Sequence, residues 1–150
     1  MTLLPVSHYP QHRQAECLAA CAAMALNYLQ VPVDYERLLK LLRIGPAGAP
    51  FRNLRYLESL GLAVNIEQGA ITILQARLRR GLPPVAFVHT GQLPYWKQAT
   101  GHAVTVIGIE ADRIYLNDPA FVQAPKEISL AEFELAWLDL DQFYATVELE

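Results

Sequence analysis

The first half of the chain has the apolar spacing of helices. Residues 17–29 are alanine, leucine and methionine with hardly a polar side chain, which predicts a helix that is buried on nearly every side. Three more helices and one strand follow in this half, each marked by an N-cap residue, a C-cap glycine or a change of apolar period. They are a helix that starts at 33–36 with Asp34 as N-cap and ends before Gly45, a helix over 51–60 stopped by Gly61, a strand over 62–67, and a helix over 71–80 stopped by Gly81.

After Pro83 and Pro84 the period changes to that of strands. The pattern then predicts strands over 85–89, 103–109, 113–116 and 143–149, with residues 110–112 as the hairpin turn between the second and third. One helix interrupts them over 130–137. Its start is marked by Ser129 and Glu132, which have the spacing of a capping box.

Helices that come mostly first and antiparallel strands that come mostly second predict an α+β fold. We expect the N-terminal helical part to pack on the C-terminal antiparallel sheet. The chain has 150 residues, a length that suits one core, and no linker or repeat divides it. The sequence therefore predicts a single domain over residues 1–150.

The composition narrows the class of protein. An apolar fraction of 53% and a charged fraction of 18% argue against disorder. The net charge is −3 with no broad basic cluster, so nucleic acid is not expected as a partner. There are two cysteines, too few for a disulfide scaffold or a Cys/His zinc site, and we expect no metal or cofactor. The oligomeric state is left open.

The N-terminus has no basic region followed by a long apolar run, so no signal peptide is predicted. The longest apolar stretch, residues 18–26, is far too short to span a bilayer. Free thiols suit a reducing compartment, and these features together predict a cytoplasmic protein. A secretory signal removed before residue 1 would change that expectation.

The candidate chemistry begins with Cys17, at the predicted start of the first helix. Free N–H groups and the positive end of the helix dipole lie there, so the pKa of the thiol should fall below its free value of about 8.5. Cys21 lies one turn further into the helix and is expected to be an ordinary buried thiol. Position alone does not exclude that Cys17 is also only a small core residue.

A candidate base and a candidate carboxylate come from the predicted hairpin. His102 opens one strand and Asp118 directly follows its partner strand. Because a tight turn brings the far ends of two strands together, the two side chains should lie side by side. A thiol, an imidazole and a carboxylate are the parts of a cysteine nucleophile, its base and the group that orients the base.

Gln11, six residues before Cys17, is the candidate donor for an oxyanion hole together with the Cys17 backbone N–H. Gln14 is the alternative, although it is close in sequence for a side chain that must fold back over the thiol. Tyr95 and Trp96 precede His102 in a loop, where they could line a substrate cleft or pack onto their own sheet.

These residues resemble the bacteriocin-processing, or double-glycine, peptidases and their stand-alone relatives, a family of papain-like cysteine peptidases. The resemblance extends over about residues 8–149. It is carried by Gln11, Glu16 and Cys17, by residues 20–24, by residues 101–104 and by residues 117–120.

The resemblance implies a papain-like fold and a peptide or protein substrate. It also implies Cys17 as nucleophile, His102 as base, Asp118 as orienting group and Gln11 as oxyanion donor. Independently of the resemblance, Leu18, Tyr95, Trp96 and Gly101 are the candidates for a substrate cleft. The chain departs from the family pattern in having Glu16 in place of Asp and Leu18 in place of Gly beside the cysteine. Leu18 puts the substrate range in question, and no transporter segment supports cleavage of a Gly-Gly leader.

Three functions fit these residues. The first is a cysteine peptidase that hydrolyses a peptide bond through a thioester. The second is an acyltransferase that passes the same thioester to an amine, and the catalytic residues do not distinguish it from the first. The third is a catalytically inactive papain-like binding module, for which a complete constellation would be unnecessary.

Overall fold

A computed structural model describes residues 3–150. In chain order its elements are α1 (Cys17–Tyr28), α2 (Tyr35–Leu41), a 3₁₀ helix η1 (Phe51–Leu60), β1 (Leu62–Gln68), α3 (Ile71–Arg79), β2 (Val85–His89), a short 3₁₀ turn η2 (Thr90–Gln92), β3 (Gly101–Glu110), β4 (Arg113–Asn117), β5 (Lys126–Ser129), α4 (Leu130–Leu138) and β6 (Phe143–Leu149). None of the helices in this part of the chain is long and apolar enough to cross a membrane.

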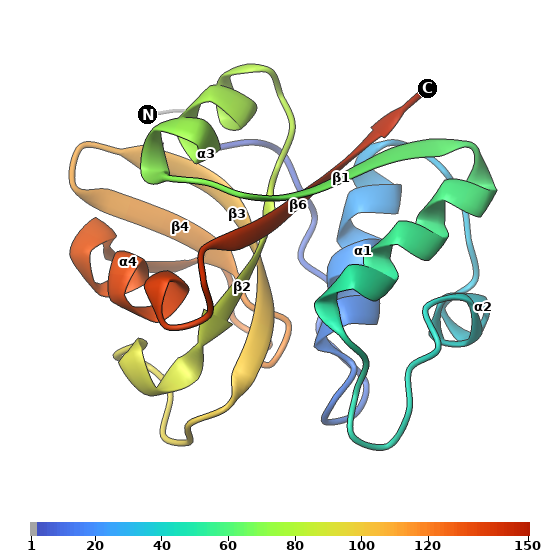
Figure 1. Cartoon of the computed structure of the whole chain (residues 1–150), viewed down its shortest axis with the longest axis horizontal. Coiled ribbons are helices and arrows are strands. Elements are labelled where there is room, and N and C mark those ends of the chain that lie inside the picture. Colours follow the sequence, from blue (N-terminus) through green and yellow to red (C-terminus); the bar gives the residue numbers. More distant parts are fainter. Residues whose placement is uncertain (1–2) are drawn as a thin grey trace.

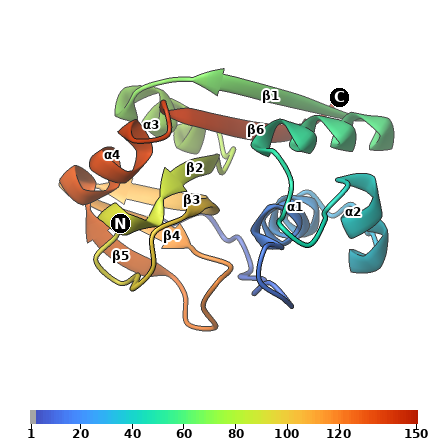
Figure 2. The same cartoon turned by 60° about the horizontal axis from the view of Figure 1, so that its bottom comes forward.

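The strands form one antiparallel sheet in the order β1-β6-β2-β3-β4-β5. Strand β6 pairs with β1 along its whole length but with β2 at only two positions. Figure 1 shows the consequence: β1 and β6 extend away from the other strands and over α1. In Figure 2, α1 and α2 lie on one side below β1 and β6, and β2–β5 with α4 lie on the other.

The predicted α+β fold is confirmed. Helix α1 is buried from Leu18 to Leu26, and α4 begins with the expected capping box, in which Ser129 Oγ accepts from the Glu132 amide at 3.1 Å. Gly61 ends η1 with a φ of 82°, a left-handed conformation that suits glycine.

Some local predictions were wrong. Strand β5 was not predicted, because its four residues are mostly polar and it lies at the sheet edge, where only β4 pairs with it. The predicted N-cap of α2 is confirmed, since the helix begins after Asp34 and ends at Leu41, before Gly45, but the Asp34 side chain makes no hydrogen bond to the helix. Residues 51–60 are helical as expected, but their form is 3₁₀.

The sheet separates two apolar cores. The larger contains α1, α2 and η1, and the smaller contains the buried face of α4 with Phe133 and Trp137. Helix α1 packs against β3, whose residues alternate between the cores. The first residue of α1 therefore lies near the start of β3. The end of β4 lies near the same place, because β3 and β4 pair as an antiparallel hairpin.

Candidate active site

Cys17 is the first residue of α1 and lies, half-buried, in the wall of a cleft. The chain turns into the helix through Ala15, whose φ of 71° is in the left-handed region. Gly48, in the loop between α2 and η1, approaches this turn closely. A Cβ atom added at Gly48 would stand 3.3 Å from the Ala15 carbonyl oxygen. Residues 46–49 line the cleft together with His102 and Trp96.

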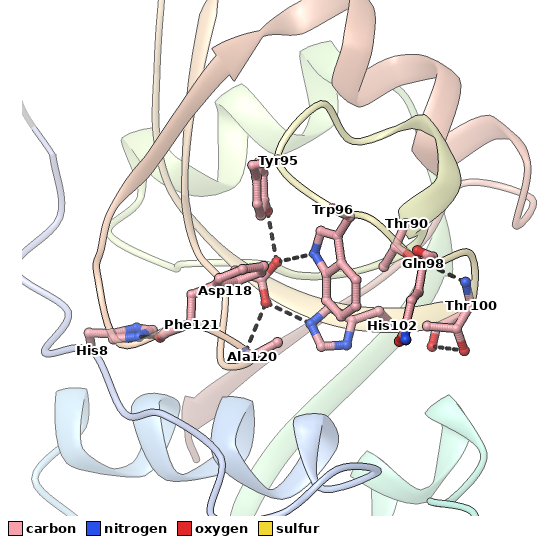
Figure 3. Close-up of polar contacts among 11 residues, drawn as sticks. His8, Thr90, Tyr95, Trp96, Gln98, Thr100, His102, Asp118, Ala120 and Phe121 are labelled. Atoms are coloured by element: carbon pink, nitrogen blue, oxygen red, sulfur yellow. Dashed lines mark hydrogen bonds and ion pairs between the residues drawn. The ribbon is translucent and has the colours of Figure 1, made fainter.

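His102 connects the thiol with Asp118. Its Nε2 lies 2.7 Å from Asp118 Oδ1 and its ring also hydrogen-bonds the Cys17 thiol, so Nδ1 is the nitrogen left to face the sulfur. Figure 3 shows the imidazole beside the carboxylate. Because the side chains of His102 and Asp118 are 5% and 0% exposed, water does not screen this interaction.

The surroundings of the two groups move their pKa values in opposite directions. Burial raises the pKa of the Cys17 thiol, but the hydrogen bond and positive charge of His102 outweigh it, and the pKa lies below its ordinary value. Burial lowers the pKa of His102, but hydrogen bonds and negative charge from Asp118 and Cys17 raise it to about 9. These shifts favour a thiolate beside an imidazolium.

Asp118 accepts four hydrogen bonds and has no exposed surface. His102 Nε2 and the Ala120 amide donate to Oδ1 at 2.7 and 3.0 Å, and Tyr95 Oη and Trp96 Nε1 both donate to Oδ2 at 2.8 Å. Burial raises the pKa of this carboxyl, but the hydrogen bond and charge of His102, with the other donors, hold it below its usual value. The carboxylate is fully satisfied as an anion.

Gln11 also lines the cleft, and its backbone N–H donates to the Pro119 carbonyl at 2.8 Å. Its side-chain Oε1 is buried and has no hydrogen-bond partner among the described residues. The NH₂ group of the same carboxamide is the part that could donate to an oxyanion. Gln14 reaches the cleft as well, from the exposed turn before α1.

The cleft has a volume of about 470 Å³. Of the residues predicted to lie there, Leu18, Trp96 and Gly101 line it. Tyr95 is not among the lining residues, because its hydroxyl is turned onto Asp118. The sequence reasoning missed other lining residues in the loop before η1, on β2 and in the loop before β3: Ala47, Gly48, Phe87, Gln98 and Thr100.

Cys21, by contrast, is fully buried in the larger core. Burial raises the pKa of its thiol well above the ordinary value. In residues 3–150, no group of three His, Cys, Asp or Glu side chains is placed to hold a metal ion.

The family model of the peptidase C39 family matches residues 6–141. The chain belongs to the peptidase C39 family. Membership confirms the predicted family and enzyme class, a cysteine-type peptidase. No curated protein matches the chain in sequence.

Solved C39-type structures share the fold along nearly the whole chain. A protein from Bacillus anthracis assigned as a C39-like peptidase has a TM-score of 0.81 at 16% identity, with 99% of this chain and 97% of that chain covered. A double-glycine motif protease of an AMS/PCAT transporter, in complex with the leader peptide, has a TM-score of 0.78 at 20% identity, with 99% of this chain and 94% of that chain covered. The peptidase domain of Streptococcus ComA, a bifunctional ABC transporter of a quorum-sensing pathway, has a TM-score of 0.79 at 15% identity, with 97% of this chain and 99% of that chain covered.

Proposed function

We propose that this C39 peptidase hydrolyses peptide bonds through a thioester on Cys17. The observation that carries the proposal is that one imidazole, His102, hydrogen-bonds both the Cys17 thiol and the buried Asp118 carboxylate at the wall of a cleft. The bridging histidine supplies the proton transfer that thiol chemistry needs.

In the first half of the reaction, the Cys17 thiolate attacks the carbonyl carbon of the scissile peptide bond. The carbon–sulfur bond forms, and the carbonyl oxygen becomes an oxyanion beside Gln11 and the Cys17 backbone N–H. When the carbon–nitrogen bond breaks, the His102 imidazolium gives its proton to the departing amine. Asp118 holds the imidazole in the tautomer whose Nδ1 faces the sulfur.

In the second half, a water molecule attacks the thioester carbon while His102 takes one of its protons. The carbon–sulfur bond breaks, a carboxylic acid leaves, and the thiolate–imidazolium pair is restored. The net reaction is the addition of one water molecule to one peptide bond. All the groups that these steps use lie between residues 11 and 118, which fits our proposal that residues 1–150 act as one peptidase domain.

A peptide is the substrate class that the cleft favours. The described residues that line it include no acidic side chain, lysine or arginine, so it suits an uncharged stretch of peptide around the scissile bond. One C39 protease that is 20% identical to this chain was solved in complex with the leader peptide, and this also supports a peptide substrate.

The direct test is to incubate the protein with a defined peptide pool and identify the products by mass spectrometry, with and without added glycinamide. We expect new carboxyl termini that do not need the amine and that carry ¹⁸O when the reaction is run in labelled water. Products that form only as glycinamide adducts would show an acyltransferase instead. Absence of any product would favour a binding module.

Replacing Gln11 with alanine is expected to lower kcat roughly 10²–10³-fold with little change in KM, because one oxyanion donor is lost only in the transition state. The measurement is steady-state cleavage of a peptide identified from the pool. Gln14→Ala is the matched control, and we expect it to keep kcat within roughly threefold of the unaltered enzyme. If Gln14→Ala has the larger effect, the oxyanion role belongs to Gln14.

A further inference from the structure

We propose that Tyr95 is a positioning residue that acts through Asp118 and sets the acidity of the His102 imidazolium. This inference rests on the function proposed above. It gives Tyr95 a role other than the predicted contact with substrate in the cleft.

The contacts of Asp118 Oδ2 carry the inference. Oδ2 receives only the Tyr95 hydroxyl and the Trp96 indole N–H, each at 2.8 Å, while His102 is bonded to the other oxygen. In Figure 3 the two aromatic side chains reach one oxygen of the carboxylate and the imidazole reaches the other. Because the carboxylate is buried, these two donors take the place of water on Oδ2.

The hydroxyl of Tyr95 is held in place by its neighbours. The edge of its ring packs on Phe121, with the ring centroids 5.3 Å apart, and Lys126 Nζ lies 5.5 Å from the ring centroid. The loop that carries Tyr95 is closed at its base by the buried Thr90, whose Oγ1 donates to the Gln98 carbonyl at 2.6 Å and accepts from the Thr100 amide at 2.9 Å. The position of the donor is therefore built into the loop.

A substitution at Tyr95 can change the pKa of His102 without changing a contact with substrate, whereas a substitution at Trp96 cannot. Trp96 lines the cleft and packs edge-on against the His102 ring, with the centroids 4.8 Å apart, so a change there alters several contacts at once. Tyr95 does not line the cleft, and its hydroxyl donates to Asp118. Burial and the negative charge of Asp118 raise the pKa of the phenol, so it remains a neutral donor.

A donor on Oδ2 withdraws negative charge from the carboxylate and makes it a weaker partner for the imidazolium. Without the phenol, Asp118 would hold the His102 proton more tightly. His102 would then be a poorer acid toward the departing amine. Tyr95 therefore keeps the proton on His102 transferable while Asp118 keeps the ring oriented.

The test is the Tyr95→Phe variant, which removes the hydroxyl and keeps the ring. The pKa of His102 is measured by ¹⁵N NMR of histidine-labelled protein, with the signal assigned by its loss in His102→Gln. We expect at least a roughly threefold decrease in the acid dissociation constant of His102. An unchanged or increased constant overturns the inference.

The matched control is Tyr144→Phe, because Tyr144 is also buried and donates to a carboxylate, Glu67 Oε2, at 3.1 Å outside the cleft. It should leave the His102 titration unchanged, and an equal shift in this variant would count against a specific role of Tyr95. If Tyr95→Phe does not fold, Trp96→Phe removes the other donor to the same oxygen and should move the constant in the same direction.

Alkylation of Cys17 by iodoacetamide separates failure of this inference from failure of the proposed function. If the unaltered protein is alkylated at Cys17 below the usual pH range of a thiol but Tyr95→Phe leaves the His102 titration unchanged, only the role of Tyr95 fails. If Cys17 in the unaltered protein reacts as an ordinary thiol, the thiolate–imidazolium pair and the proposed function both fail.

Discussion

Replacing Cys17 with alanine will abolish peptide cleavage and alkylation by iodoacetamide near neutral pH, whereas Cys21→Ala will leave both in place. The thiolate is the reacting species, and the pKa of Cys17 lies below its ordinary value while that of Cys21 is raised well above it. Access points the same way, since Cys17 lines the cleft and Cys21 has no exposed surface. The Cys21 change leaves only a small cavity, at a cost of about 1 kcal/mol.

The measurement is the alkylation rate between pH 4 and 10, with the labelled cysteine identified by peptide mapping. A lowered pKa means that the thiolate is already present at a pH where an ordinary thiol is protonated, so the onset for Cys17 should lie on the acidic side of a free cysteine. The pKa of His102 is about 9, so the imidazole stays protonated until the pH approaches that value. The thiolate–imidazolium pair therefore exists from the pH at which Cys17 loses its proton up to about 9. Equal labelling of the two variants would contradict the assignment, and an ordinary onset for Cys17 would favour a binding module.

The sequence was most informative where the chemistry is local. The positions of the two cysteines in one helix separated a thiol at the helix start from one a turn inside it, and the structure has Cys17 as the first residue of α1 and Cys21 in the core. The hairpin argument was also local, because a tight turn fixes which strand ends meet. In the structure, His102 and Asp118 are joined by a bond of 2.7 Å.

The sequence was least informative where loops fold back on the site. Tyr95 and Trp96 belong to a loop whose path depends on Thr90 closing its base and on Phe121 from another loop. Neither contact has a sequence pattern, so Tyr95 was considered for the cleft wall or for packing onto its own sheet, and not as a donor to Asp118. Strand β5 was missed for a similar reason, since pairing with β4 and not its own apolar pattern makes it a strand.

The second large effect is expected for Asp118→Asn, which should lower kcat roughly 10³–10⁴-fold. Every hydrogen bond that reaches the Asp118 side chain comes from a donor, two on each oxygen. An asparagine must turn its NH₂ group toward one of these pairs, and two donors then face a donor. If the NH₂ group faces His102, the imidazole takes the tautomer with the proton on Nδ1, which cannot accept a proton from Cys17.

Two measurements test this expectation: kcat for an identified peptide, and the pH at which alkylation of Cys17 begins, which should move upward because the imidazolium loses its anionic partner. The loss of buried charge-assisted bonds should also lower the free energy of unfolding by about 3 kcal/mol. Asp139→Asn is the matched control, since Asp139 Oδ2 lies 3.7 Å from His89 Nδ1 in a more exposed His–Asp pair outside the cleft. If the two variants lose activity equally, the effect is a general one of charge, and Asp118 does not orient His102.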